Sequence, residues 1–129
     1  LPPRITLAAR INLAGLLLEN GEAAAAHTLA SQACAIAPEL ALCWYQLGLA
    51  ERQLGRLPAA AAAYDRALER DPNHAPSVRN RALVALMLGD INAARSGFLR
   101  AITLLEQQGR SGEAAQLRRQ AGELVKLES

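Results

Sequence analysis

The sequence predicts an all-α protein built from antiparallel pairs of helices. Apolar and small residues recur at spacings of three and four along most of the chain, which is the pattern of a buried helix face. Glycines interrupt these runs, and Gly21, Gly55 and Gly89 stand 34 residues apart. A helix-turn-helix unit of that length cannot bury its apolar face alone, so we expect neighbouring units to stack in one array.

The middle unit, residues 41–74, shows the pattern best. We expect its helices over residues 40–54 and 57–70, with the chain reversing at Gly55 and the unit ending at Pro72. Small and apolar residues on both helices fall on the face that the two helices share. These residues are Trp44, Leu47, Gly48 and Glu51 on the first helix and Ala60, Tyr64 and Ala67 on the second.

The first unit, residues 7–40, is expected to hold helices over residues 5–19 and 22–36. Gly21 supplies the left-handed conformation that ends the first of these helices. The inward side of the second helix consists of small residues, which allow close packing. They are Ala26, Ala30 and Ala33.

The third unit, residues 75–108, is expected to hold helices over residues 75–88 and 91–107. Its first helix departs from the pattern of the middle unit, since a valine, an arginine and an alanine replace Trp44, Leu47 and Gly48. The residues concerned are Val78, Arg81 and Ala82, while Phe98 and Ala101 keep the pattern of the second helix.

A last helix is expected at about residues 111–127, with Ser111 able to cap it near Gly112. It has an apolar stripe on one side and polar residues on the other, so it can cover the end of the array. The stripe consists of Ala114, Leu117, Ala121, Leu124 and Val125.

These residues resemble the tetratricopeptide repeat pattern, whose period is 34 residues. The resemblance runs from Leu7 to about Gln108, and Glu51 departs from it by standing where the family usually has a tyrosine or another bulky residue. It implies a right-handed α-solenoid of three antiparallel helix pairs with a C-terminal capping helix, and a single domain over residues 1–129. The matching residues are Trp44, Leu47, Gly48, Ala60, Tyr64, Ala67 and Pro72.

Composition excludes several classes of function. The net charge is only +2, the basic residues (13 of the 14 are arginine) are spread along the chain, and aromatic residues make up 3%. No basic surface interleaved with stacking side chains is therefore expected, and nucleic acid is not expected as a partner. No apolar run approaches the roughly 18 residues that a membrane span needs.

The ends and the composition suggest an origin. The chain begins with Leu1 rather than methionine, so we expect an excised domain of a longer protein. The bias toward arginine and alanine suggests a bacterial, cytoplasmic source.

No catalytic centre, metal site or cofactor site is expected, because no set of reactive residues converges. His27 and His74 lack a neighbouring nucleophile and are assigned solvent or capping roles. Ser31 lies near Cys34 without a base. Cys34 and Cys43 are interpreted as small buried residues, with an adventitious disulfide left open because the two lie on adjacent helices.

The resemblance implies that the first helices of successive pairs line a concave groove for a protein or peptide partner. The groove residues are those on the first helices that face away from the helix partner. They are Ile11, Gly15 and Leu18, then Tyr45, Leu49 and Arg52, then Arg79, Leu83 and Leu86.

One subclass of the family is disfavoured. Arrays that bind the C-terminal carboxylate of heat-shock chaperones use lysines and asparagines on three first helices. The matching residues here form no cationic clamp, so a groove for an amphipathic helix with acidic residues or for an extended apolar peptide is favoured. These residues are Ile11, Gly15, Gln46, Pro76 and Asn80.

The leading hypothesis is a non-enzymatic scaffold or adaptor that binds a partner segment in the groove. Two alternatives stay open: a substrate-recruiting region of a larger bacterial transferase, and a self-associating assembly module whose first repeat stacks on another copy as a homo-oligomer.

Overall fold

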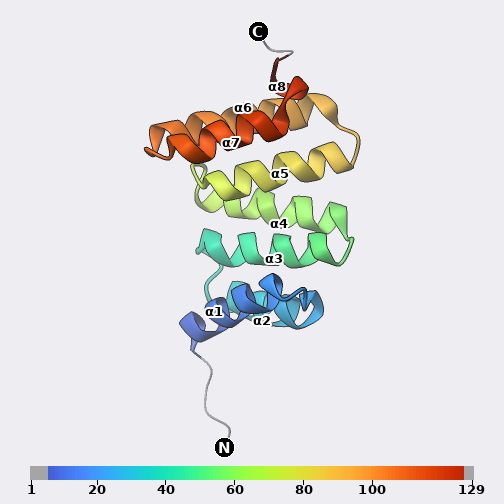
Figure 1. Cartoon of the computed structure of the whole chain (residues 1–129). Coiled ribbons are helices and arrows are strands. Elements are labelled where there is room, and N and C mark those ends of the chain that lie inside the picture. The colour runs from blue at the N-terminus through green and yellow to red at the C-terminus, as the bar shows by residue number, and fades with distance from the viewer. Residues whose placement is uncertain (1–5, 127–129) are drawn as a thin grey trace, which may run out of the picture. The chain divides into compact units, whose positions relative to one another are not determined.

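The computed structural model describes residues 6–126, and these residues form eight helices and no strand (Figure 1). The prediction of an all-α fold of helix pairs is confirmed. The expected helix start at Ile5 and the expected end at Leu127 lie outside the described residues. The helices are α1 (Leu7–Glu19), α2 (Ala23–Ile36), α3 (Ala41–Gln53), α4 (Leu57–Arg70), α5 (Ala75–Met87), α6 (Ile91–Gln107), α7 (Ser111–Ala121) and α8 (Glu123–Lys126).

The chain divides into two compact units after residue 72. The first contains α1 to α4, in which α1 packs on α2, α2 on α3, α3 on α4, and α1 also on α3. The second contains α5 to α8, in which α5 packs on α6, and α7 and α8 both pack on α6.

Each pair of helices is closed by the same turn. At Gly55, whose φ is 78°, the glycine N–H donates to Arg52 O at 2.9 Å and the Arg56 N–H donates to Glu51 O at 2.9 Å. These two bonds satisfy carbonyl groups at the helix end, and the left-handed backbone between them strongly favours glycine. The same two-bond turn recurs at Gly21 and Gly89, which explains the 34-residue spacing of the glycines.

The inward residues predicted on the second helices of the first two pairs are buried, whereas Trp44, Leu47 and Glu51 on α3 are only partly buried and contact α2. Ala26, Ala30 and Ala33 on α2 have almost no exposed surface, and the same holds for Ala60, Tyr64 and Ala67 on α4.

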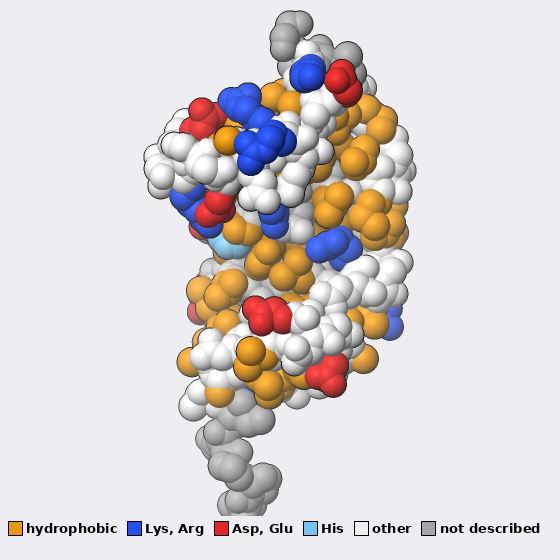
Figure 2. Space-filling model, in the orientation of Figure 1, with side chains coloured by type: hydrophobic (Ala, Val, Ile, Leu, Met, Phe, Trp, Pro, Cys, Tyr) orange, Lys and Arg blue, Asp and Glu red, His pale blue; other side chains and the backbone are white. Residues whose placement is uncertain are grey.

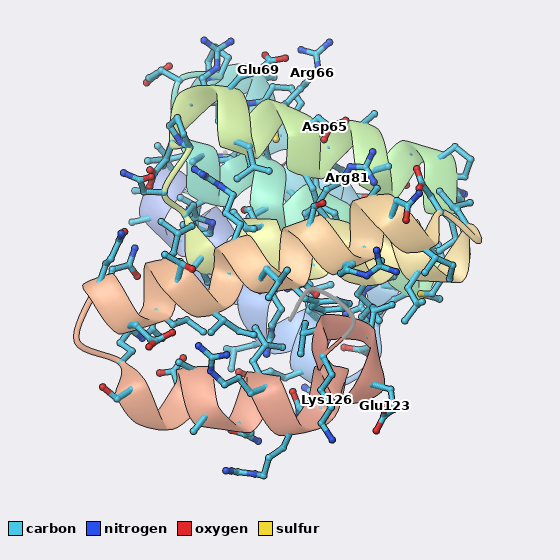
Figure 3. All side chains as sticks on the ribbon, turned by 90° about the horizontal axis from the view of Figure 1, so that it is seen from above. Asp65, Arg66, Glu69, Arg81, Glu123 and Lys126 are labelled. Atoms are coloured by element: carbon cyan, nitrogen blue, oxygen red, sulfur yellow. The ribbon has the colours of Figure 1, made fainter. Side chains whose placement is uncertain are left out.

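Trp44 holds the junction between α2 and α3. Its indole N–H donates to Pro38 O at 2.8 Å, and its ring packs against a cluster that contains Cys34 and Cys43. The guanidinium of Arg66, which projects outward from α4 in Figure 3, lies 4.9 Å from the centre of the indole ring.

The two helices of a pair approach so closely that one side chain must be very small. A Cβ built at Gly48 would lie 2.5 Å from the Tyr64 ring, so only glycine fits between α3 and α4. Between α5 and α6 the glycine lies on the second helix of the pair instead of the first. A Cβ on Gly97 of α6 would lie 2.7 Å from Ala82 Cβ on α5.

The last predicted helix is two helices rather than one, which corrects the expectation of a single continuous helix. Gly122 adopts a φ of 46° and a ψ of −121°, which ends α7 and redirects the chain into α8. Arg95 Nε then donates to Leu124 O at 3.2 Å and ties α8 to α6. The expected cap was also wrong: Ser111 is the first residue of α7, and the cap position is Arg110.

We predict that Gly48→Ala lowers the free energy of unfolding by about 1–3 kcal/mol, because the added methyl group overpacks the α3–α4 interface. Urea unfolding followed by circular dichroism measures this change. The matched control is Gly15→Ala on α1, where the new Cβ meets only Gln46 Nε2 at 3.6 Å. That change should raise stability by up to about 1 kcal/mol, since alanine is the better helix former. Equal effects at both glycines would contradict the packing interpretation.

Candidate partner-binding surface

The first helices of the first unit lie side by side, because α1 packs directly on α3 as well as on α2. Two glutamines of α3 hold α1 in place. Gln46 Nε2 donates to Ile11 O at 2.8 Å, and Gln53 Nε2 donates to Leu18 O at 3.0 Å. The two glutamines are seven residues apart, as are the two carbonyl groups, so the bonds repeat after two helical turns. Together they fix the register of α1 against α3.

Gln46 and Asn80 stand at two of the positions that bind a C-terminal carboxylate in the chaperone-binding subclass. Here both side chains make contacts within the protein. Gln46 uses its amide N–H to bind α1. Asn80, one of the other matching residues, donates from Nδ2 to Pro76 O at 2.8 Å within α5. Both side chains are buried. The polar groups at these positions therefore hold the protein's own helices.

Five of the six groove residues predicted for the first unit are partly exposed on α1 and α3. The exception is Leu18, which is 7% exposed and packs against Ala26 and Ala50. Its side chain thus belongs to the core and cannot serve as a contact for a partner. The partly exposed residues are Ile11, Gly15, Tyr45, Leu49 and Arg52.

Buried residues pack against two of these partly exposed side chains. The ring of Tyr45 lies 6.1 Å from the ring of buried Tyr64, and Leu49 packs against the cluster that contains Leu18. Arg52 Nε is shielded from water and has no hydrogen-bond partner among the described residues. The surface therefore combines apolar groups held in fixed positions with the positive charge of a partly exposed guanidinium.

The second unit presents its predicted residues on α5. Arg79 and Leu86 are exposed, and Leu83 is half-buried. Figure 2 shows apolar side chains gathered around the end where α5 turns into α6. The exposed large residues at this turn are Leu86, Met87, Leu88 and Ile91.

The histidine assignments need correction. His27 on α2 contacts Glu51 on α3, with Nε2 and Oε1 2.8 Å apart, and Arg56 approaches the same oxygen at 3.3 Å. His27 Nδ1 also lies 3.5 Å from the Ser31 hydroxyl, so His27 does have a neighbouring nucleophile and Ser31 does have a base. The spacing of four residues within one helix could have revealed this pair from the sequence.

Ser31, His27 and Glu51 contact one another in the order of a serine–histidine–carboxylate catalytic triad, but their surroundings differ from those of a triad. The hydroxyl is at the outer limit of hydrogen bonding, and Ser31 lies within α2, whose interior amide groups donate along the helix. Among the described residues, no free backbone donors face Ser31 to stabilise an oxyanion. The contact is therefore interpreted as a link between α2 and α3. It also explains why Glu51 replaces the bulky residue usual at this position.

The remaining candidates for chemistry serve the fold. His74 precedes α5, and its Nδ1 lies 2.6 Å from the hydroxyl of buried Ser77, so the expectation that His74 lacks a neighbouring nucleophile was also wrong. Cys34 and Cys43 are free, buried thiols. Burial raises the pKa of the Cys34 thiol to about 12, and the neighbouring Cys43 adds to the shift, so this thiol stays protonated at neutral pH.

The described residues hold no group of three or more histidine, cysteine, aspartate or glutamate side chains suited to a metal ion. None of the helices that the structure describes is both long and apolar enough to span a membrane.

Family models support the repeat assignment. A tetratricopeptide repeat model matches residues 41–74, and a second model of the same description matches residues 63–96. The chain contains tetratricopeptide repeats. A comparison with curated protein sequences gave no match.

Solved structures share this repeat architecture. A T3SS complex from Aeromonas hydrophila is 24% identical over 94% of this chain and 79% of that chain, with a TM-score of 0.82. PcrH in complex with the chaperone binding region of PopD is 22% identical over 95% of this chain and 93% of that chain, with a TM-score of 0.86. The Yersinia enterocolitica type III secretion chaperone SycD, bound to a peptide of the translocator YopD, is 21% identical over 98% and 96%, with a TM-score of 0.79. At these identities the likeness shows the fold alone.

We predict that His27 and Glu51 stabilise the first unit through a measurable coupling. Glu51 is only 12% exposed, so a double-mutant cycle with His27→Ala and Glu51→Ala should give about 0.5–1 kcal/mol. Urea unfolding of the four variants measures it. The control is the exposed pair Arg110 and Glu113, 2.9 Å apart on the surface, whose cycle should give a coupling near zero. A coupling no larger than that of the control would show that the α2–α3 link is incidental.

Proposed function

We propose that this protein is a non-enzymatic adaptor that binds a peptide segment of another protein on the first helices of its repeats. The observation that carries the proposal is the surface of α1 and α3. There Ile11, Tyr45 and Leu49 are partly exposed, and the positively charged Arg52 lies about one turn after Leu49 on α3. Apolar anchors beside a charged donor are the usual composition of a surface that binds a peptide.

The solved structures support a partner of this kind. PcrH was crystallised with the chaperone binding region of PopD, and SycD with a peptide of YopD. Both of those proteins share the fold of this chain and hold a segment of another protein. By analogy, the partner here would be a segment of another protein.

Arg52 would orient the segment. It carries positive charge on α3, so an acidic or carboxylate-bearing segment is favoured at the first unit. In the second unit, Arg79 is an exposed positive charge on α5.

Self-association is a second candidate, because α1 also exposes a different apolar face. Leu13 and Leu16 are 41% and 56% exposed, although their equivalents in the middle repeat, Leu47 and Ala50, are more buried. A second copy of the chain could cover this face.

We predict that Arg52→Glu weakens binding of a peptide segment by about tenfold or more, since a charge-assisted hydrogen bond contributes about 1.5–3 kcal/mol. The probe is the tightest peptide selected by the full wild-type chain from a displayed random library, and its affinity is measured by fluorescence anisotropy.

The melting temperature of the variant is measured alongside its affinity, because Arg52 is partly buried and its Nε is shielded from water. The matched control is Arg119→Glu, an exposed arginine on α7 whose charge reversal should leave affinity unchanged. An affinity unaffected by the reversal at Arg52 would remove the surface of α1 and α3 as the binding site.

A further inference from the structure

One apolar face of α1 is exposed, although the equivalent face of α3 is largely covered. Leu13 and Leu16 on α1 are 41% and 56% exposed. The residues 34 positions further along are Leu47, which packs against the cluster that contains Cys34, and Ala50, which has no exposed surface. The side of α1 that carries Leu13 and Leu16 is called the α1 outer face.

The helix that covers this face on α3 is α2, the second helix of the preceding pair. Ala50 belongs to the same buried cluster as Ala26 of α2, and Glu51 Oε1 lies 2.8 Å from His27 Nε2 of α2. The covering helix thus presents small side chains, which let it lie close to the residues opposite. By the repeat register, the α1 outer face is equipped to pack against a helix of the same kind.

Polar residues beside this face indicate what else such a helix carries. On α3, Gln46 and Gln53 donate to carbonyl groups of α1 at 2.8 and 3.0 Å. The equivalent residues on α1 are Asn12 and Glu19, and both are exposed. The Asn12 amide can donate in the same way, whereas the Glu19 carboxylate can only accept.

Glu19 therefore needs a donor that bears a positive charge. It makes no ion pair with any residue that the structure describes. It is also the last residue of α1, where the helix dipole disfavours a negative charge. A basic residue placed beside Glu19 would offset this effect and form a charge-assisted hydrogen bond.

We propose that the α1 outer face binds an α-helix of another protein, with small apolar residues along one side and a basic residue near the end that meets Glu19. The helix would lie against α1 as α2 lies against α3. The proposal does not depend on the peptide surface of α1 and α3. Ile11 and Gly15 of that surface are each two residues from Leu13, which places them on the other side of α1.

A second copy of the chain fits this face less well than another protein. The small residues of its second helices are already used within its own array, since Ala26, Ala60 and Ala94 have no exposed surface. A contact between two α1 outer faces would include both Glu19 carboxylates. The only basic residue of α1, Arg10, already donates to Gln32 Oε1 at 3.1 Å.

The test uses the full chain and a stapled helical peptide with the sequence of α2, Ala23–Ile36, in which Cys34 is replaced by alanine. This is the helix that covers the equivalent face of α3. We expect Leu16→Gln to weaken binding of the peptide by about tenfold in fluorescence anisotropy, without lowering the melting temperature. The matched control is Met87→Gln in the second unit. Met87 is 52% exposed, and its replacement should leave the affinity unchanged.

A second measurement tests the role of Glu19. Versions of the peptide carry lysine or glutamate at Ala24 or at Ala25, which are exposed in the first turn of α2. At one of these positions lysine should give an affinity about threefold higher than glutamate. Glu19→Gln should abolish this difference, and the control Glu39→Gln, at an exposed carboxylate after α2, should preserve it.

Several outcomes would overturn the proposal. Unchanged affinity in Leu16→Gln, or no binding of the α2 peptide up to about 1 mM, would exclude the helix site. A charge preference that survives Glu19→Gln would exclude the basic residue of the partner. A dimer that Leu16→Gln dissociates in sedimentation velocity would assign the face to a second copy.

The proposed function is tested separately. The library-selected peptide that probes the surface of α1 and α3 should bind Leu16→Gln as tightly as the wild-type chain. Equal weakening of both peptides by Leu16→Gln would show that they share one site, and would overturn the α1 outer face as a separate one.

Discussion

The close approach of the two helices within each pair is the constraint on which the rest of the structure depends. Helices can lie this near one another only where one of the facing residues is very small. Each pair meets this requirement differently: Gly48 accepts the Tyr64 ring in the second pair, and Gly97 accepts Ala82 in the third. In the first pair, both equivalent positions, Ala14 and Ala30, are alanines with almost no exposed surface. The glycine turns then bring the two helices of each pair back together, so the period of the turns is also the period of the sequence.

The sequence predicted this architecture well because its signals are local. Helix ends depend on glycine and on apolar periodicity, and the predicted boundaries of α4 and α6 match those of the structure. The end of α7 at Gly122 was not predicted, because the apolar stripe of the sequence continues past this residue. The separate helix α8 packs on α6, and this contact cannot be seen in the sequence. The contact between Glu51 and His27 was not predicted either. It joins two helices, and only the folded chain brings His27 within 2.8 Å of that carboxylate.

The candidate surface was predicted less completely than the fold. The repeat register placed six positions of the first unit on α1 and α3, and five of them are partly exposed. Leu18 is buried, since the α1–α2 turn brings its side chain against Ala26. The register alone could not reveal what Gln46 does, because its bond to Ile11 O depends on how α1 and α3 pack together. Residues that identify the family, such as Gly48 and Tyr64, are thus used for packing, whereas neighbours on the same helix face outward.

That division between packing and binding residues is the central claim, and methyl NMR of the full chain tests it most directly. Adding the selected peptide should shift the methyl signals of Ile11 and Leu49, which lie on the first helices. It should leave those of Leu29 on α2 and Leu68 on α4 unchanged, although these leucines are also half-buried. Shifts concentrated at Leu29 and Leu68, with Ile11 and Leu49 unaffected, would place binding on the second helices and contradict the account.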